Sequence, residues 1–351
     1  MPTRPSSPYW RRHEAALRKS QRRVEPWASP DGSPMTPTPR LSGAYAPILT
    51  PFTPDGGTID WEAYRQQLDY LRGAGLDGVV VLGTNGEYGQ LSDEEKYQLV
   101  TTTLEANTGL RVIVGGTKPE SASGTLALLA RLETLAPRIA AVLVAPPFFR
   151  NYAAGETVAA REVVQFYRSA VQMLDGLPLL LYNVPVPAGG QVTAEVTPQA
   201  VATLADEPGI VGIKDSSGQA ELILAYQAAR PGLRLLVGSD HLVAAAVDGG
   251  AAGSVTACAN VFPAAVLAVY RASQGPEREA AQARLSALRR VLELVPGKLV
   301  AAQKMMLARL GVVPRQSPVR VGGELTPDEA AAVWEALEAA GGAVAPPGRR
   351  D

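Results

Sequence analysis

Lysine is scarce in this chain of 351 residues, and one lysine stands where it could act as a nucleophile. Of 33 basic residues, 27 are arginine and 6 are lysine. Lys214 follows the apolar run 210–213, so its stem should leave the end of a buried strand. Burial disfavours the charged ammonium and lowers its pKa, and a neutral amine forms a Schiff base with a ketone. Gly212 would keep the space beside the amine open. The alternative is an ion pair of Lys214 with Asp215 or another acid.

Two other segments could complete such chemistry. Tyr182 ends the apolar run 178–182. A phenol there could donate and accept protons while a carbinolamine forms and loses water. A core tyrosine with a satisfied hydroxyl is the alternative. The turn 83–87 leads towards a helix, and its glycines would let backbone N–H groups face a carboxylate or a phosphate, unless it is an ordinary tight turn.

These residues follow short apolar runs that must be strands. Most runs contain Val, Ile, Leu and Ala without alternation, which is typical of parallel strands covered on both faces. Helical patterns lie between them and begin at recognisable signals, such as the capping box from Ser92 to Glu95 and the Pro198 after Thr197. The runs are 44–50, 78–82, 111–115, 140–145, 178–182, 209–214, 234–237 and 253–256.

Eight strand–helix units predict an α/β fold, the (β/α)8 TIM barrel, in which chemistry is done at the C-terminal ends of the strands. A doubly wound open sheet is the alternative. Residues 40–274 would form the barrel, and helical patterns at 277–294, 298–310 and 327–340 predict a C-terminal three-helix appendage over 275–340.

The two ends of the chain differ from this body. Residues 1–39 are rich in proline and in basic side chains, which predicts a disordered basic tail, or a reading frame that extends upstream of a true start at Met35. The Gly/Pro-rich segment 341–351 would be a frayed tail.

Composition argues against several classes of function. The formal charge is −1, whereas nucleic-acid binders are usually strongly basic, so no nucleic-acid partner is expected. One cysteine, Cys258, and two histidines, His13 and His241, offer no pattern for a metal site. The apolar stretches are interrupted well short of the ~20 residues of a membrane-spanning helix, so no membrane partner is expected.

Three features that resemble functional sites have simpler interpretations. The run 73–78 fits G-x-G-x-x-G, but it ends a helix and leads into a strand, whereas a dinucleotide fingerprint follows a strand and opens a helix. It predicts a helix C-cap and turn. His241 follows a strand and is expected to cap or to lie at the surface. Cys258 is expected to be a small buried residue.

Taken together and in order, several segments resemble the dihydrodipicolinate synthase / N-acetylneuraminate lyase family of pyruvate-dependent class I aldolases. The resemblance covers about residues 41 to 340. It rests on a segment like the family's opening strand, a G-[TS]-x-G-E signature, a Y-N-x-P segment, a Schiff-base lysine segment and the turn after strand 8. These are Pro47-Ile48-Leu49-Thr50-Pro51-Phe52, Gly83-Thr84-Asn85-Gly86-Glu87, Tyr182-Asn183-Val184-Pro185, Gly212-Ile213-Lys214-Asp215 and Ala257-Cys258-Ala259-Asn260.

The resemblance implies three catalytic residues. Lys214 would be the Schiff-base lysine, Tyr182 the proton-transfer tyrosine beside it, and Thr84 the hydroxyl that links the relay. An iminium at Lys214 would act as the electron sink, so no metal or organic cofactor is expected. An enamine formed from it would add to an aldehyde in the synthetic direction.

The resemblance also implies how the substrate is bound. Asn85 and Gly86 would lie in the turn that holds the pyruvate carboxylate, and the carbonyl of Val255 would lie near the bound keto acid. The expected partners are pyruvate, or another 2-keto acid, and an aldehyde. A cytoplasmic homo-oligomer, a tetramer, is expected from the family.

Two positions depart from the synthases in this family. Phe149 stands where they carry a tyrosine donated across a subunit interface, and Tyr152 is a candidate to substitute for it. Pro187 stands where they carry an arginine that binds the carboxylate of the semialdehyde. Loss of that arginine should weaken binding of the semialdehyde. The Thr-Asn-Gly-Glu turn and the run 214–218 look closer to 4-hydroxy-2-oxoglutarate aldolases.

The leading prediction is therefore a Schiff-base aldolase or lyase that cleaves or makes a 2-keto acid. Dihydrodipicolinate synthase and 2-keto-3-deoxy sugar-acid aldolase remain open within that class. The alternatives outside it are a non-catalytic barrel that binds a keto acid and a phosphate-binding barrel of another family.

Overall fold

Eight parallel strands close the barrel. The computed structural model describes residues 41–342 apart from 107, 118–121, 134, 147–159, 175–176 and 185–194. Within these residues each strand pairs with the next along the chain, and β8 pairs with β1. The strands are β1 (Gly43–Pro47), β2 (Gly78–Val81), β3 (Arg111–Gly115), β4 (Ala141–Val144), β5 (Leu179–Asn183), β6 (Ile210–Asp215), β7 (Arg234–Val237) and β8 (Gly253–Val255).

Both faces of the strands are buried. In β2 every residue is buried, although side chains alternate between the two faces. Val80 belongs to an apolar cluster inside the barrel with Ile113 and Leu180, whereas Val79 and Val81 belong to the larger cluster that includes the helices. The absence of alternation in the sequence therefore has a physical cause, and the predicted (β/α)8 barrel is confirmed.

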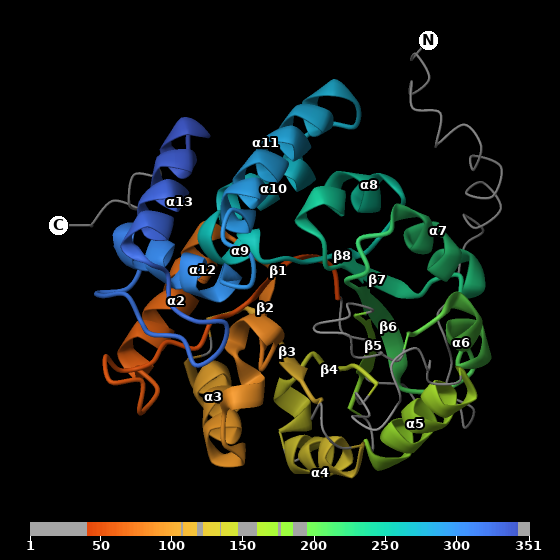
Figure 1. Ribbon diagram of the computed structural model, residues 1–351. Coiled ribbons are helices and arrows are strands. Elements are labelled where there is room, and N and C mark those ends of the chain that lie inside the picture. Colours follow the sequence, from red (N-terminus) through yellow and green to blue (C-terminus); the bar gives the residue numbers. More distant parts are fainter. Residues whose placement is uncertain are drawn as a thin grey trace.

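Helices surround the strands, as Figure 1 shows. α2 begins where the Asp60 side chain accepts the N–H of Ala63, and it ends at Gly75, whose φ of +88° favours glycine. Gly75 lies within the G-x-G-x-x-G match, so that match caps a helix as predicted. The helices after β1 to β7 are α2 (Trp61–Ala74), α3 (Asp93–Ala106), α4 (Ala122–Glu133), α5 (Ala160–Met173), α6 (Pro198–Thr203), α7 (Ala220–Ala229) and α8 (Val243–Asp248). Short 3-10 helices are η1 (Thr84–Gly86), η2 (Tyr88–Gln90), η3 (Ala136–Arg138) and η4 (Asp240–Leu242).

The chain continues beyond the barrel into the predicted appendage. α9 (Cys258–Val261) and α10 (Pro263–Arg271) follow β8, and α11 (Pro276–Glu293), α12 (Leu299–Arg309) and α13 (Pro327–Ala339) follow them. In Figure 1 the blue helices α12 and α13 lie at one side of the ring. The appendage of three C-terminal helices is thus confirmed. The predicted tail 1–39 and most of 341–351 lie outside the described residues.

Several strand ends differ from the prediction. β5 and β6 each run one residue beyond the predicted end, to Asn183 and Asp215, which are partners in the strand ladder and whose side chains are hydrogen-bonded to each other. β1 ends at Pro47 rather than Thr50, and the buried residues after it lead into the turn that contacts the appendage.

A buried ion pair ties the appendage to the loop after β2. Glu87 has a left-handed φ of +54°, and its carboxylate accepts the Lys304 ammonium at 2.6 Å. The side chains are 0% and 2% exposed. The same carboxylate also accepts the backbone N–H groups of Arg320 and Val321 at 2.6 and 3.1 Å. Burial lowers the pKa of Lys304, and the charge of Glu87 opposes that shift. One carboxylate thus holds both α12 and the segment that follows it.

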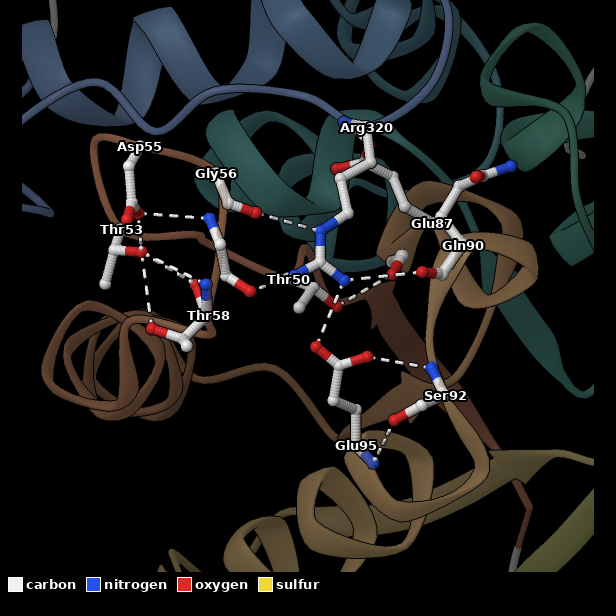
Figure 2. A network of polar contacts seen from close by, with 12 residues as sticks. Thr50, Thr53, Asp55, Gly56, Thr58, Glu87, Gln90, Ser92, Glu95 and Arg320 are labelled. Carbon is white, nitrogen blue, oxygen red and sulfur yellow. Dashed lines mark hydrogen bonds and ion pairs between the residues drawn. The ribbon is translucent and has the colours of Figure 1, made fainter.

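Arg320 extends this connection to two more loops, as Figure 2 shows. Its guanidinium donates to the carbonyls of Gly56, Gly57 and Gln90 and to the Glu95 carboxylate at 3.1 Å. Glu95 in turn belongs to the predicted capping box with Ser92. The loops after β1 and β2 are therefore fixed from the C-terminal side.

We expect Glu87→Gln to lower the free energy of unfolding by about 3–5 kcal/mol, because it leaves a buried ammonium without a carboxylate. Denaturant unfolding measures this. Glu94→Gln is the matched control, since its pair with Arg131 is exposed and should contribute less than about 1 kcal/mol. Adding Lys304→Met to Glu87→Gln should recover part of the loss. Equal losses for Glu87→Gln and Glu94→Gln would contradict this account of the connection.

Candidate active site

The register of β5 and β6 sorts four polar residues into two pairs. Tyr182 lies opposite Lys214, and Asn183 lies opposite Asp215. Successive side chains on a strand point to opposite faces, so the first pair faces the barrel mouth and the second faces the helices. Asn183 donates to Asp215 at 2.7 Å, and both are almost fully buried.

Lys214 has no acidic partner among the described residues. Its Nζ lies 3.3 Å from the Tyr182 hydroxyl and 4.4 Å from the centre of the Tyr182 ring. The Asp215 carboxylate is occupied by Asn183 and by the hydroxyl of Ser217, at 2.7 Å each. The alternative of an ion pair between Lys214 and Asp215 is therefore wrong. Lys214 is 7% exposed and reaches the cavity as a buried amine.

Opposing effects act on Tyr182. Burial raises the pKa of its phenol, but the nearby Lys214 charge and hydrogen bonding by Ser216, Lys214 and Thr84 outweigh burial, so the pKa lies below its ordinary value. The tyrosines in purely structural positions behave in the opposite way. Burial raises the pKa of Tyr45 and of Tyr70 to about 12. A phenol that gives up its proton more readily is better suited to proton transfer.

The turn after β2 contains two backbone N–H groups that could donate to a ligand. η1 begins at Thr84, and within the described residues the backbone N–H groups of Thr84 and Asn85 have no acceptor. The N–H of Gly86 instead donates to the carbonyl of Gly83 at 3.0 Å. A Cβ on Gly86 would lie 3.0 Å from the carbonyl oxygen of Ile48. Gly86 thus shapes the turn, while Thr84 and Asn85 present donors at a helix start, where an anion is favoured.

The Asn85 side chain contacts the appendage. Its Nδ2 donates to Oε1 of Gln303 at 3.5 Å, and the same oxygen accepts from Asn260 at 3.0 Å. Gln303 belongs to α12 and is 0% exposed. Sequence reasoning missed Gln303, because nothing in a helical pattern shows that a glutamine faces the barrel.

A cavity of about 480 Å³ occupies the mouth of the barrel. Five of the six predicted site residues line it, namely Thr84, Asn85, Tyr182, Lys214 and Val255. Gly86 is not among the described lining residues. Much of the remaining lining is apolar and includes Pro47, Leu82, Leu143, Ala145, Val184 and Ala257. The appendage adds Arg289 and Leu299, which sequence reasoning also missed.

The glycine near the lysine has a different role from the predicted one. A Cβ on Gly212 would lie 2.2 Å from the carbonyl oxygen of Arg234 and 2.8 Å from Leu180, so Gly212 allows β6 to approach β7 and the barrel core. It does not keep space beside the amine open. Gly238 lines the cavity, and a Cβ there would lie 2.1 Å from Oγ of Ser216.

The remaining sequence features lie away from the chemistry or outside the described residues. His241 is partly exposed and contacts Glu293 at 3.3 Å, as a surface residue would, and Cys258 is buried. Across the described ranges no group of three His, Cys, Asp or Glu side chains could hold a metal ion. No helix there is both long and apolar enough to cross a membrane. Phe149, Tyr152 and Pro187 fall outside the described residues.

Comparison with known proteins places the chain among relatives. The dihydrodipicolinate synthetase family matches residues 40–340. A DapA-like lyase of Chloroflexus aurantiacus, itself uncharacterized, is 35% identical over 252 residues, which cover 70% of this chain and 80% of the relative. A 4-hydroxy-tetrahydrodipicolinate synthase of Xanthomonas campestris is 34% identical over 244 residues, 69% of this chain and 76% of the relative.

A solved structure agrees with this assignment. The dihydrodipicolinate synthase of Bacteroides thetaiotaomicron superposes with a TM-score of 0.73 at 28% identity, and the match covers 85% of this chain and 98% of that one. The match of the family over most of the chain bears out the resemblance drawn from the motifs. This chain belongs to the dihydrodipicolinate synthetase family and is a pyruvate-dependent Schiff-base lyase.

Proposed function

We propose that this chain cleaves a 4-hydroxy-2-oxo acid to pyruvate and an aldehyde, and catalyses the reverse addition, with Lys214 as the nucleophile. One observation carries the proposal. A buried lysine amine lies in a largely apolar cavity, 3.3 Å from a tyrosine hydroxyl and without a carboxylate partner among the described residues. The arrangement places a nitrogen that can attack a ketone beside a hydroxyl that can exchange protons with the reacting groups.

The chemistry begins with imine formation. The amine of Lys214 adds to the C2 carbonyl of the oxo acid, and the carbinolamine loses water to give an iminium. The 4-hydroxyl group then loses its proton, the C3–C4 bond breaks, and its electron pair moves into the iminium. The products of this step are the aldehyde and the enamine of pyruvate. Protonation of the enamine at C3 and hydrolysis release pyruvate and restore the amine.

Tyr182 is the proton carrier in this proposal. Its hydroxyl lies next to the nitrogen that forms the imine, so it can deliver a proton to the departing water and take one from the 4-hydroxyl group. Thr84 helps to lower the pKa of the Tyr182 phenol by hydrogen bonding. Thr84 thus links Tyr182 to the turn after β2.

The turn after β2 would hold the carboxylate of the oxo acid. The N–H groups of Thr84 and Asn85 are its donors, and the Asn85 side chain is fixed by Gln303. The carbonyl of Val255, at the end of β8, would lie near the bound acid. The Gly86 amide takes no direct part, since it is used within the turn.

The substrate favoured by the sequence is 4-hydroxy-2-oxoglutarate, on the Thr-Asn-Gly-Glu turn and the run 214–218. Synthesis of dihydrodipicolinate from aspartate semialdehyde is disfavoured by Phe149 and Pro187. Membership of the family also supports a homotetramer that works in the cytoplasm. Sedimentation analysis tests the tetramer directly.

We expect borohydride to trap pyruvate on Lys214, because hydride reduces the iminium to a stable secondary amine. Mass spectrometry of the digested protein identifies the modified residue. Lys214→Met should give no adduct, while the matched control Lys298→Met, which removes a lysine outside the cavity, should be trapped as fully as the wild type. Failure to find an adduct on any lysine of the wild type would refute the proposed function.

Removal of the Lys214 charge should raise the pKa of Tyr182. Tyrosinate absorbance, followed as pH rises, should show a phenol in the wild type that ionises below the ordinary value of about 10. In Lys214→Met this ionisation should move to higher pH, because the charge that favours the phenolate is gone. Tyr182→Phe should abolish it. An unchanged titration in Lys214→Met would show that the two groups are not coupled as described.

Turnover separates an enzyme from a barrel that only binds. With 4-hydroxy-2-oxoglutarate, Tyr182→Phe should lower kcat by about 10²- to 10⁴-fold, the usual contribution of a positioned acid–base group. A pyruvate-linked assay measures this, and an unchanged denaturant midpoint serves as the control for an intact fold. Turnover of aspartate semialdehyde with pyruvate, in place of 4-hydroxy-2-oxoglutarate, would instead make the chain a synthase. Trapping without turnover of either would leave a keto-acid binder.

A further inference from the structure

The cavity is larger than pyruvate requires and carries a second cationic group. Its volume is about 480 Å³. Pyruvate has only six non-hydrogen atoms, and for scale one molecule of liquid water occupies about 30 Å³. The described lining residues include two cationic side chains, Lys214 and Arg289, and no acidic one. Lys214 is used in the imine. The proposed function assigns no role to Arg289.

Arg289 enters the cavity from outside the barrel. It belongs to α11, in the appendage, and its guanidinium is hydrogen-bonded near the ends of β7 and β8. Nη1 donates to Asp240 at 3.3 Å, and Asp240 begins η4 just after β7. Asp240 also accepts the N–H of Cys258, the first residue of the helix after β8. Of these two strands, β7 pairs directly with β6, which carries Lys214.

Two carboxylates fix the guanidinium without using all of its donors. Nε donates to Glu293 at 2.8 Å and Nη1 to Asp240 at 3.3 Å, while Nη2 donates to no described residue. An arginine has five N–H donors, so three remain for a ligand in the cavity. Neighbouring Nη1 and Nη2 hydrogens suit the two oxygens of a carboxylate.

The negative charges of Glu293 and Asp240 do not cancel the preference of Arg289 for an acidic ligand. Glu293 is 42% exposed, so water screens it, and it also contacts His241. Asp240 is fully buried, and burial raises its pKa, although Arg289 opposes that shift. Both carboxylates lie outside the described cavity lining. Arg289 thus lines the cavity, while its two acidic partners do not.

We propose that Arg289 binds an acidic group at the far end of the substrate, so that the site selects 2-oxo acids with a second carboxylate. This inference rests on the proposed function, because the near end of the substrate is placed by the imine at Lys214. It gives the appendage a role in specificity. Arg289 reaches the cavity from α11, outside the barrel.

The test compares two five-carbon acids that form the same imine. 2-Oxoglutarate carries a distal carboxylate, and 2-oxopentanoate has a methyl group in its place. The concentration of each that gives half-maximal borohydride trapping on Lys214 is measured for the wild type and for variants, with pyruvate as reference. No turnover is needed, so binding of the far end is isolated from the cleavage step.

The wild type should trap 2-oxoglutarate at a concentration about 10- to 100-fold lower than 2-oxopentanoate, as expected for charge-assisted hydrogen bonds. Arg289→Met should remove that preference and leave trapping of pyruvate unchanged. Arg289→Lys should retain part of the preference, since lysine keeps the positive charge but lacks the paired N–H donors of the guanidinium. Arg290→Met, which removes the adjacent exposed arginine, should behave as the wild type.

The outcomes separate the two proposals. If the wild type traps pyruvate but shows no preference between the five-carbon acids, Arg289 has no such role and the proposed function stands. If Arg289→Met weakens trapping of all three acids equally, Arg289 is a structural residue and the inference is overturned. If pyruvate is not trapped at all, both proposals fall. If Arg289→Met does not fold, absence of the preference in the wild type still overturns the inference, and a reduced preference in Arg289→Lys still assigns the role to Arg289.

Discussion

The parallel register between β5 and β6 is the constraint on which the site depends. It sets Tyr182 beside Lys214 on the face towards the mouth, and Asn183 beside Asp215 on the face towards the helices. Lys214 is followed directly by Asp215, which is a potential partner for an ion pair. The strand geometry separates them, and Asn183 and Ser217 satisfy the buried carboxylate. The amine is thereby left with a phenol as its neighbour, which can exchange protons with it.

The appendage is part of the site as well as part of the fold. The Glu87–Lys304 pair holds the loop that begins with the turn proposed to bind the carboxylate, and Gln303, one residue before Lys304, contacts Asn85. Both contacts come from α12. Because the turn has left-handed residues at its two ends, Leu82 and Glu87, it needs outside support to keep its shape. The support comes from a helix more than two hundred residues further along the chain.

Residues at strand ends could be predicted from the sequence, because an apolar run that stops at a polar residue marks the mouth of a barrel. Lys214, Tyr182 and the turn at Thr84 were found in this way. The partner of Asp215, which is Asn183, could not be predicted, since it depends on the register between two strands. Gly212 was misinterpreted for a similar reason: what it allows is contact with the carbonyl of Arg234 on another strand.

Residues on helices were harder to find. Gln303 and Arg289 contribute through the way α11 and α12 pack against the barrel, and periodicity shows only that these helices have a buried side. Arg289 and Arg290 are adjacent in the sequence, and only the packing of α11 distinguishes the one at the cavity from the exposed one. The family signature does not extend to them, because it is confined to the barrel strands and the turns that follow them.

Arg289 lies on a helix that the chain reaches only after the barrel is complete, and this separation has an evolutionary consequence. Recombination in the segment between α10 and α11 would exchange the group at the far end of the cavity while leaving the nucleophile and its proton carrier intact. The incoming segment would have to bring a lysine that matches Glu87. Chimeras that respect this one pairing offer a route to altered substrate range within a single scaffold.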